Sequence, residues 1–119
     1  MMNELIEQAI LALKLKILEF VPEVGDFETI TVEFPNPDES LCVEKFWFEV
    51  AQPPVGVENR DTKRVMYMCA KRKGSDSVME VMTASCGRQQ ILEKLDDPEF
   101  IQRLVVHAGK LSYHLQDLH

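Results

Sequence analysis

The chain has 119 residues, the usual length of one domain, and 45% of them are hydrophobic and 28% charged, a balance typical of a globular protein. The formal net charge is −7, and the first 40 residues carry all of it, with nine acidic residues against Lys14 and Lys16. Nucleic acid binding needs a basic patch that neutralises phosphates, so this balance argues against a nucleic-acid partner. We expect one domain spanning 1–119.

The N-terminal segment and the cysteines bear on the cellular compartment. The first residues are acidic, and Lys14 and Lys16 interrupt the apolar run at 9–13, so the pattern differs from that of a signal peptide. No stretch approaches the roughly 20 apolar residues that span a bilayer, which predicts no membrane partner. The three cysteines lack a C-x-x-C spacing, so we expect a cytoplasmic protein with reduced thiols at Cys42, Cys69 and Cys86.

The segment 3–21 has the periodicity of an amphipathic helix. Its apolar residues fall within roughly 100° of one another around the helix axis and predict a face that packs on a core. They are Ile6, Ala9, Ile10, Leu13, Ile17 and Phe20. Pro22 and Gly25 should end the helix, because neither residue favours its continuation.

Four strands are predicted next, at 28–34, 42–50, 64–71 and 77–84. The first alternates between apolar and polar residues, so one of its faces should meet water. In the second, Phe46 is expected on one face, and Val43 and Trp47 on the other. The third is apolar on both faces, which predicts a central strand that is covered at least partly on each side. A tight turn at 73–76 predicts that the third and fourth strands form a hairpin.

Two helices complete the chain, a short one at about 87–95 and a long one that starts at Pro98. Asp97 should cap the long helix, and a proline in the first helical position sacrifices no hydrogen bond. The apolar stripe of this helix, which includes Leu104, Leu111 and Leu118, is about 140° wide and should dock along the sheet. The chain is therefore predicted to be α+β, with the order α-β-β-β-β-α-α and an antiparallel sheet.

Catalytic chemistry has one weak candidate, Cys86, because a thiol at the start of a helix is favoured as thiolate by the N–H groups and the helix dipole. A base for this thiol would have to come from the last helix, which carries His107 and His114. These two histidines lie roughly 10.5 Å apart along the helix axis, which is too far for both to bind one metal ion without other ligands between them. We predict no cofactor and no metal site. The alternative function is a small cysteine-dependent enzyme or a small-ligand-binding domain that uses Cys86 and the long 51–62 loop.

Two features favour binding over catalysis. Leu11, Leu15 and Leu18 form a second apolar row on the first helix, opposite the core stripe, and such a row calls for a partner unless the domain covers both sides of the helix. The second feature is a set of four methionines in the predicted hairpin, which suit either a core or an adaptable surface. They are Met66, Met68, Met79 and Met82.

The leading prediction is therefore a non-catalytic protein-binding module, such as a small acidic chaperone or adaptor. We expect it to act as a homodimer, or to meet a protein partner, through the row formed by Leu11, Leu15 and Leu18.

Overall fold

The computed structural model describes residues 2–19, 29–36, 43–74 and 76–116. It confirms the α+β class and the predicted order of helices and strands, and adds one 3-10 turn and one two-residue strand. The elements are α1 (Met2–Glu19), β1 (Ile30–Pro35), β2 (Val43–Ala51), η1 (Arg60–Thr62), β3 (Lys63–Arg72), β4 (Ser77–Val81), β5 (Cys86–Gly87), α2 (Arg88–Leu95) and α3 (Pro98–Gln116). Several residues discussed above lie outside the described ones: Phe20, Pro22, Gly25, Cys42 and Leu118.

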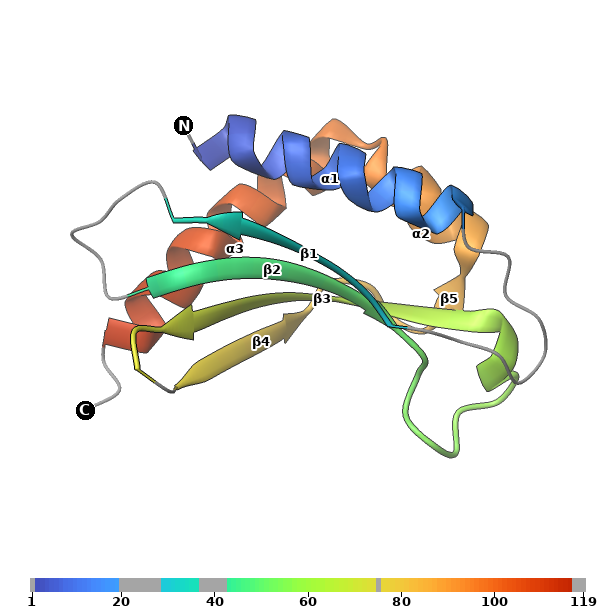
Figure 1. The fold of residues 1–119 in the computed structure, drawn as a ribbon. Coiled ribbons are helices and arrows are strands. Elements are labelled where there is room, and N and C mark those ends of the chain that lie inside the picture. Colours follow the sequence, from blue (N-terminus) through green and yellow to red (C-terminus); the bar gives the residue numbers. More distant parts are fainter. Residues whose placement is uncertain (1, 20–28, 37–42, 75, 117–119) are drawn as a thin grey trace.

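The sheet is antiparallel, with the strand order β1-β2-β3-β4. The short β5 pairs with the start of β3, where Arg64 lies opposite Cys86. The predicted β3–β4 hairpin is confirmed, and the Arg72 N–H closes its turn by donating to the Asp76 carbonyl at 2.7 Å. The three described helices lie on one face of the sheet (Figure 1), so no described helix covers the opposite face.

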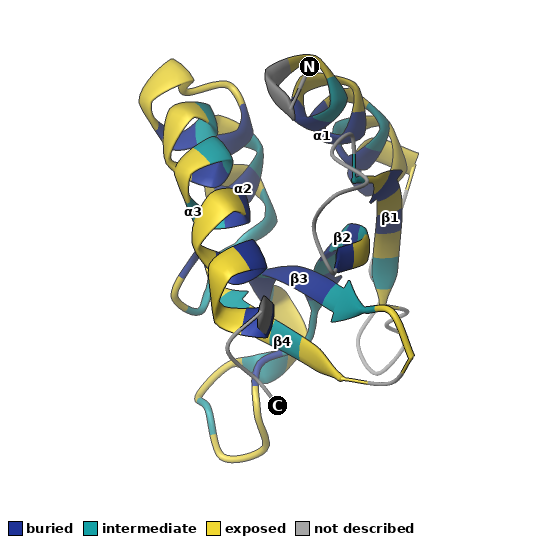
Figure 2. Ribbon diagram, turned by 90° about the vertical axis from the view of Figure 1, so that its left-hand side faces the viewer, coloured by how far each residue is buried: buried dark blue, intermediate teal, exposed yellow. Residues whose placement is uncertain are grey.

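The core fills the space between the helices and the covered face of the sheet (Figure 2). Ile6 and Leu13 of α1 are fully buried, as their place on the predicted stripe requires. The Phe34 ring lies 5.4 Å from that of Phe46 and 5.2 Å from that of Phe48, measured between centroids. Such ring pairs add about 0.5–1.5 kcal/mol beyond the burial of area, so they join β1 firmly to β2.

The second strand and the fourth differ from the prediction at their ends. A register shift between Val43 and Lys45 turns Val43 onto the core side, where it is buried, because a bulge breaks the strict alternation of faces. The fourth strand ends at Val81 instead of 84. Beyond that point the Thr83 hydroxyl accepts the Met66 N–H at 3.0 Å. A side chain thus takes the place of the backbone carbonyl that a continued β4 would offer to this N–H.

Helix α3 begins at the predicted boundary. Its N-terminus is capped by Asp97, whose Oδ1 accepts the Glu99 N–H at 3.0 Å, and Pro98 occupies the first position. A single stripe of α3 is buried, which confirms that the helix docks along the sheet: Phe100, Leu104, Ala108, Leu111 and Leu115. None of the described helices is long and apolar enough to cross a membrane.

Candidate functional site

Helix α1 carries an exposed row of three leucines on the side away from its core stripe. Leu11, Leu15 and Leu18 are 58%, 54% and 56% exposed, whereas Leu13, on the opposite side, is 0% exposed. The idea that the domain covers α1 on both sides is therefore wrong for the described part of the chain. That the row binds a partner stays a prediction.

Polar contacts on both flanks fix the rotation of α1. The Lys16 ammonium donates to the Thr31 carbonyl at 3.0 Å, which ties the helix to β1. On the other flank the Lys14 ammonium pairs with the carboxylate of Asp96, and Arg88 Nη2 donates to the carbonyl of Leu18 at 3.2 Å. These contacts, together with the buried stripe, hold the three leucines toward solvent.

The border of the leucine row is acidic. Glu4 and Glu7 lie exposed near its N-terminal end and Glu19 at its C-terminal end, and none of them forms an ion pair with another described residue. The two lysines of α1 are engaged with Asp96 and the Thr31 carbonyl. Among the described residues, the exposed face of α1 thus combines apolar side chains with carboxylates that have no ion-pair partner.

Cys86, the weak catalytic candidate, is half-buried in β5 and lies before the start of α2. The N-cap of α2 is Gly87, and the side-chain oxygen of Gln90 accepts the Gly87 N–H at 2.8 Å, which closes this helix end. Cys86 borders a shallow polar depression of about 360 Å³ together with Gln90, Glu93, Lys94 and Asp97. No described histidine lines this depression, so among the described residues Cys86 has no imidazole as a base.

The 51–62 loop is held by hydrogen bonds of its own. Arg60 Nε donates to the Pro53 carbonyl at 2.7 Å, and both the N–H and the hydroxyl of Thr62 donate to the Asn59 carbonyl. Asn59 adopts a left-handed φ of 56°, a conformation that asparagine tolerates better than most residues. The loop leads into β3 next to β5, so the structure does bring its end close to Cys86.

The hairpin methionines divide between the core and the surface. Met66, Met68 and Met82 are buried, whereas Met79 is 60% exposed on the face of the sheet opposite the helices. On that face Cys69 is fully buried between its neighbours, and burial raises the pKa of its thiol to about 12. Both faces of β3 are therefore covered, as its two apolar faces predict.

One surface was not anticipated from the sequence, namely the outer edge of β4 and the groove between β4 and α3. The groove is lined by Val78, Met79, Glu80, Lys110, Leu111 and His114. The methionines of the predicted hairpin, Met79 among them, are the one sequence signal that points to it. Its recognition also requires the order of the strands and the position of α3, which the pattern of residues does not contain.

The described residues include no group of three or more histidine, cysteine, aspartate or glutamate side chains placed to hold a metal ion. Cys69 and Cys86 are both free thiols. Comparisons of the chain with protein-family models, with curated proteins and with solved structures found no match.

Proposed function

We propose that the protein is a non-catalytic protein-binding module, a small acidic chaperone or adaptor, which forms a homodimer through the leucine row of α1. The observation that carries the proposal is the exposure of Leu11, Leu15 and Leu18 on a helix whose other side is fully packed. Three neighbouring large apolar side chains at helical spacing present a contiguous surface for a partner helix.

The expected strength of the dimer follows from the exposed area. Burial of the exposed half of one leucine side chain contributes about 1 kcal/mol. The leucines of two copies together contribute about 6 kcal/mol, near the lower end of the roughly 4–15 kcal/mol that association costs in lost freedom. The row alone therefore leaves at most about 2 kcal/mol, which corresponds to a Kd of tens of millimolar. A dimer that forms at about 1 mM thus also needs favourable contacts at the border of the row.

The acidic border restricts how two copies can meet. A parallel arrangement would place Glu4 and Glu7 next to the same residues of the second copy, and like charges repel. An antiparallel or oblique crossing separates these carboxylates and still joins the leucines. Higher salt screens the remaining repulsion, so the homodimer should tighten or change little as the ionic strength rises.

The test replaces Leu11 and Leu15 by lysine together and measures the mass in solution by light scattering over a concentration series. The proposal predicts that the wild type is dimeric at high concentration and that the double variant is a folded monomer. Val106→Lys is the matched control, because Val106 is 50% exposed on another helix. This control variant should dimerise like the wild type.

Two results would refute the proposed surface. The first is a double variant that remains dimeric with an unchanged concentration dependence. The second is a wild type that stays monomeric up to about 1 mM, a concentration at which even a weak specific dimer should form. Melting curves of all three proteins show whether each substitution leaves the fold intact.

A further inference from the structure

The hydrogen bonding of the β3–β4 hairpin leaves one side of β4 open. In an antiparallel ladder, alternate residues direct both their N–H and C=O groups to the partner strand. The bonds from Arg72 to Asp76 and from Met82 to Met66 fix the phase of this alternation. Val78 and Glu80 therefore bond to β3, while the residues between and beside them direct their main-chain groups outward: Ser77, Met79 and Val81.

The two edges of the sheet are protected differently. At the β1 edge the Lys16 ammonium covers the Thr31 carbonyl, and Pro35 has no N–H to offer. Natural proteins use such lysines and prolines to prevent another strand from adding to an edge. Strand β4 contains neither residue type, and among the described residues its only partner strand is β3. Within the described part of the chain, the β4 edge is thus open to a further strand.

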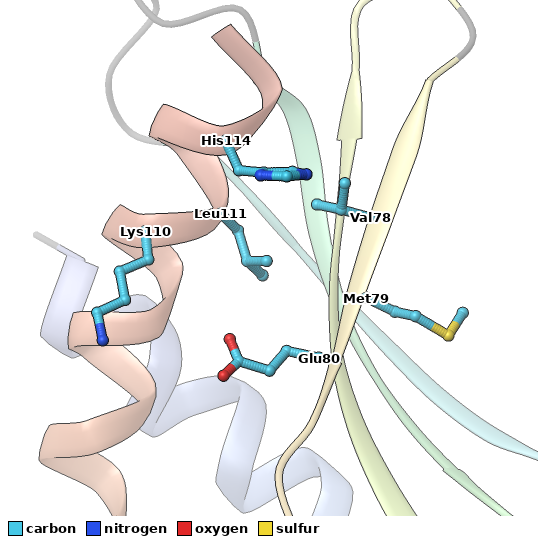
Figure 3. A pocket seen from close by; sticks show the side chains of 6 residues that line it. All are labelled: Val78, Met79, Glu80, Lys110, Leu111 and His114. Carbon is cyan, nitrogen blue, oxygen red and sulfur yellow. The ribbon is translucent and has the colours of Figure 1, made fainter. Parts of the chain in front are cut away.

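A groove of about 420 Å³ runs beside this edge, between β4 and α3. Figure 3 shows Val78 and Glu80 directed toward α3, with Leu111 and His114 facing them, while Met79 points to the other face of the sheet. Met79 and Val81 are 60% and 56% exposed there. A strand added to β4 would therefore meet apolar side chains on both of its faces.

The groove also has a charge preference. Glu80 has a close neighbour within the domain, because its Oε2 lies 2.8 Å from Nδ1 of His107, although the two atoms lack the alignment of a hydrogen bond. Lys110 forms no ion pair with another described residue. On a protein with a net charge of −7, Lys110 thus presents at this end of the groove an ammonium group without an ion-pair partner among the described residues, and such a group favours a carboxylate.

We propose that the outer edge of β4 binds an extended segment of a partner protein, which adds as a strand and places an acidic side chain near Lys110. A five-residue strand spans about 17 Å, the length of β4, and main-chain hydrogen bonds supply the affinity while alternate side chains supply the selectivity. The site is separate from the leucine row and goes beyond the homodimer function. The competing occupant is a second copy of the chain added edge to edge, and the experiments below distinguish it from the peptide.

The probe is a fluorescein-labelled nine-residue peptide in which threonine and valine alternate and glutamate is central, so that glutamate and valine lie on opposite faces. Fluorescence anisotropy measures its affinity, and NMR measures the exchange of main-chain amides in the protein. The proposal predicts saturable binding that slows exchange at Met79 and Val81. A second peptide with glutamine in place of glutamate should bind roughly 5-fold more weakly, the effect of one exposed ion pair of about 1 kcal/mol.

Three variants separate the parts of the proposal. Lys110→Glu should weaken the glutamate peptide about 5-fold or more and leave the glutamine peptide within about 2-fold. Met79→Pro removes an outward N–H without breaking a bond to β3 and should weaken both peptides, whereas the control Met79→Ala retains that N–H and should weaken them less. If Met79→Pro unfolds the domain, Lys110→Glu on the surface of α3 still decides the charge prediction.

The proposal for the β4 edge and the homodimer proposal can each be refuted without refuting the other. The Leu11→Lys, Leu15→Lys double variant should bind the peptide as the wild type does. Absence of saturation at about 1 mM peptide, or amide changes confined to α1, would overturn the edge proposal and leave the leucine row untouched. Protection of Met79 and Val81 that rises with protein concentration and excludes the peptide would also overturn it, because the edge would then bind a second copy.

Discussion

Leu104→Ala tests the assignment of α3 to the core. Leu104 is 0% exposed in the middle of the buried stripe of α3, between the fully buried Ala108 and the nearly buried Phe100. The substitution removes three carbons, which cost about 0.8 kcal/mol each in transfer from water. The cavity adds to this cost because the neighbouring residues of the stripe hold the helix in place, so we expect a loss of about 3 kcal/mol.

The measurement is urea unfolding followed by far-ultraviolet circular dichroism at one fixed protein concentration, since dimerisation would otherwise contribute to stability. A loss of about 3 kcal/mol corresponds to a fall of roughly 12 °C in melting temperature for a domain of this size. The dependence of the unfolding free energy on urea should keep its slope, because the area exposed on unfolding hardly changes.

Val106→Ala is the matched control for this experiment. Val106 is in the same helix, two residues from Leu104, but is 50% exposed. Alanine is also the better helix former, so the control should change stability by less than about 0.5 kcal/mol. If Leu104→Ala lost less than about 1 kcal/mol, or no more than Val106→Ala, the packing of α3 against the sheet would be wrong.

Two further predictions concern the thiols. Cys86→Ser should leave the melting temperature, the dimer and the peptide affinity unchanged. Loss of the dimer or of peptide binding in a folded variant would revive the cysteine-dependent alternative. For Cys69, burial raises the pKa to about 12, so between pH 9 and 12 the unfolded thiol releases its proton while the folded one retains it. Stability must then fall with rising pH, and from pH 8 to 10 the wild type should lose about 1.4 kcal/mol more than Cys69→Ala in urea unfolding. Equal losses would contradict the buried, neutral thiol.

The helices were predictable because the spacing of their apolar residues shows which side of each helix packs against the core. The stripes containing Leu13 of α1 and Leu104 of α3 are single, wide and apolar, and both are buried as expected. The cap formed by Asp97 was also predictable, since it depends only on residues adjacent in sequence. Local rules suffice for such features.

The departures have nonlocal causes. Val43 packs in the core because a bulge shifts the pairing of β2 with β3, and a bulge cannot be recognised from one strand alone. β4 ends early because the Thr83 hydroxyl accepts the N–H of Met66, a residue 17 positions away in the chain. Likewise, the periodicity of α1 shows two apolar faces but leaves open whether α3 covers the second. Only the arrangement of the helices on the sheet decides that the leucines remain exposed.

The positions of the two proposed surfaces allow them to act together. Helix α1 lies along β1, and the strand order β1-β2-β3-β4 places β4 at the opposite edge of the sheet (Figure 1). Three strand spacings separate β1 from β4, about 14 Å. A homodimer through Leu11, Leu15 and Leu18 therefore leaves both β4 edges accessible. Such a dimer could bind two extended segments of one partner, and the second contact would then form at a high effective concentration. The leucine row would in this way raise the affinity of an edge site to which it contributes no contact.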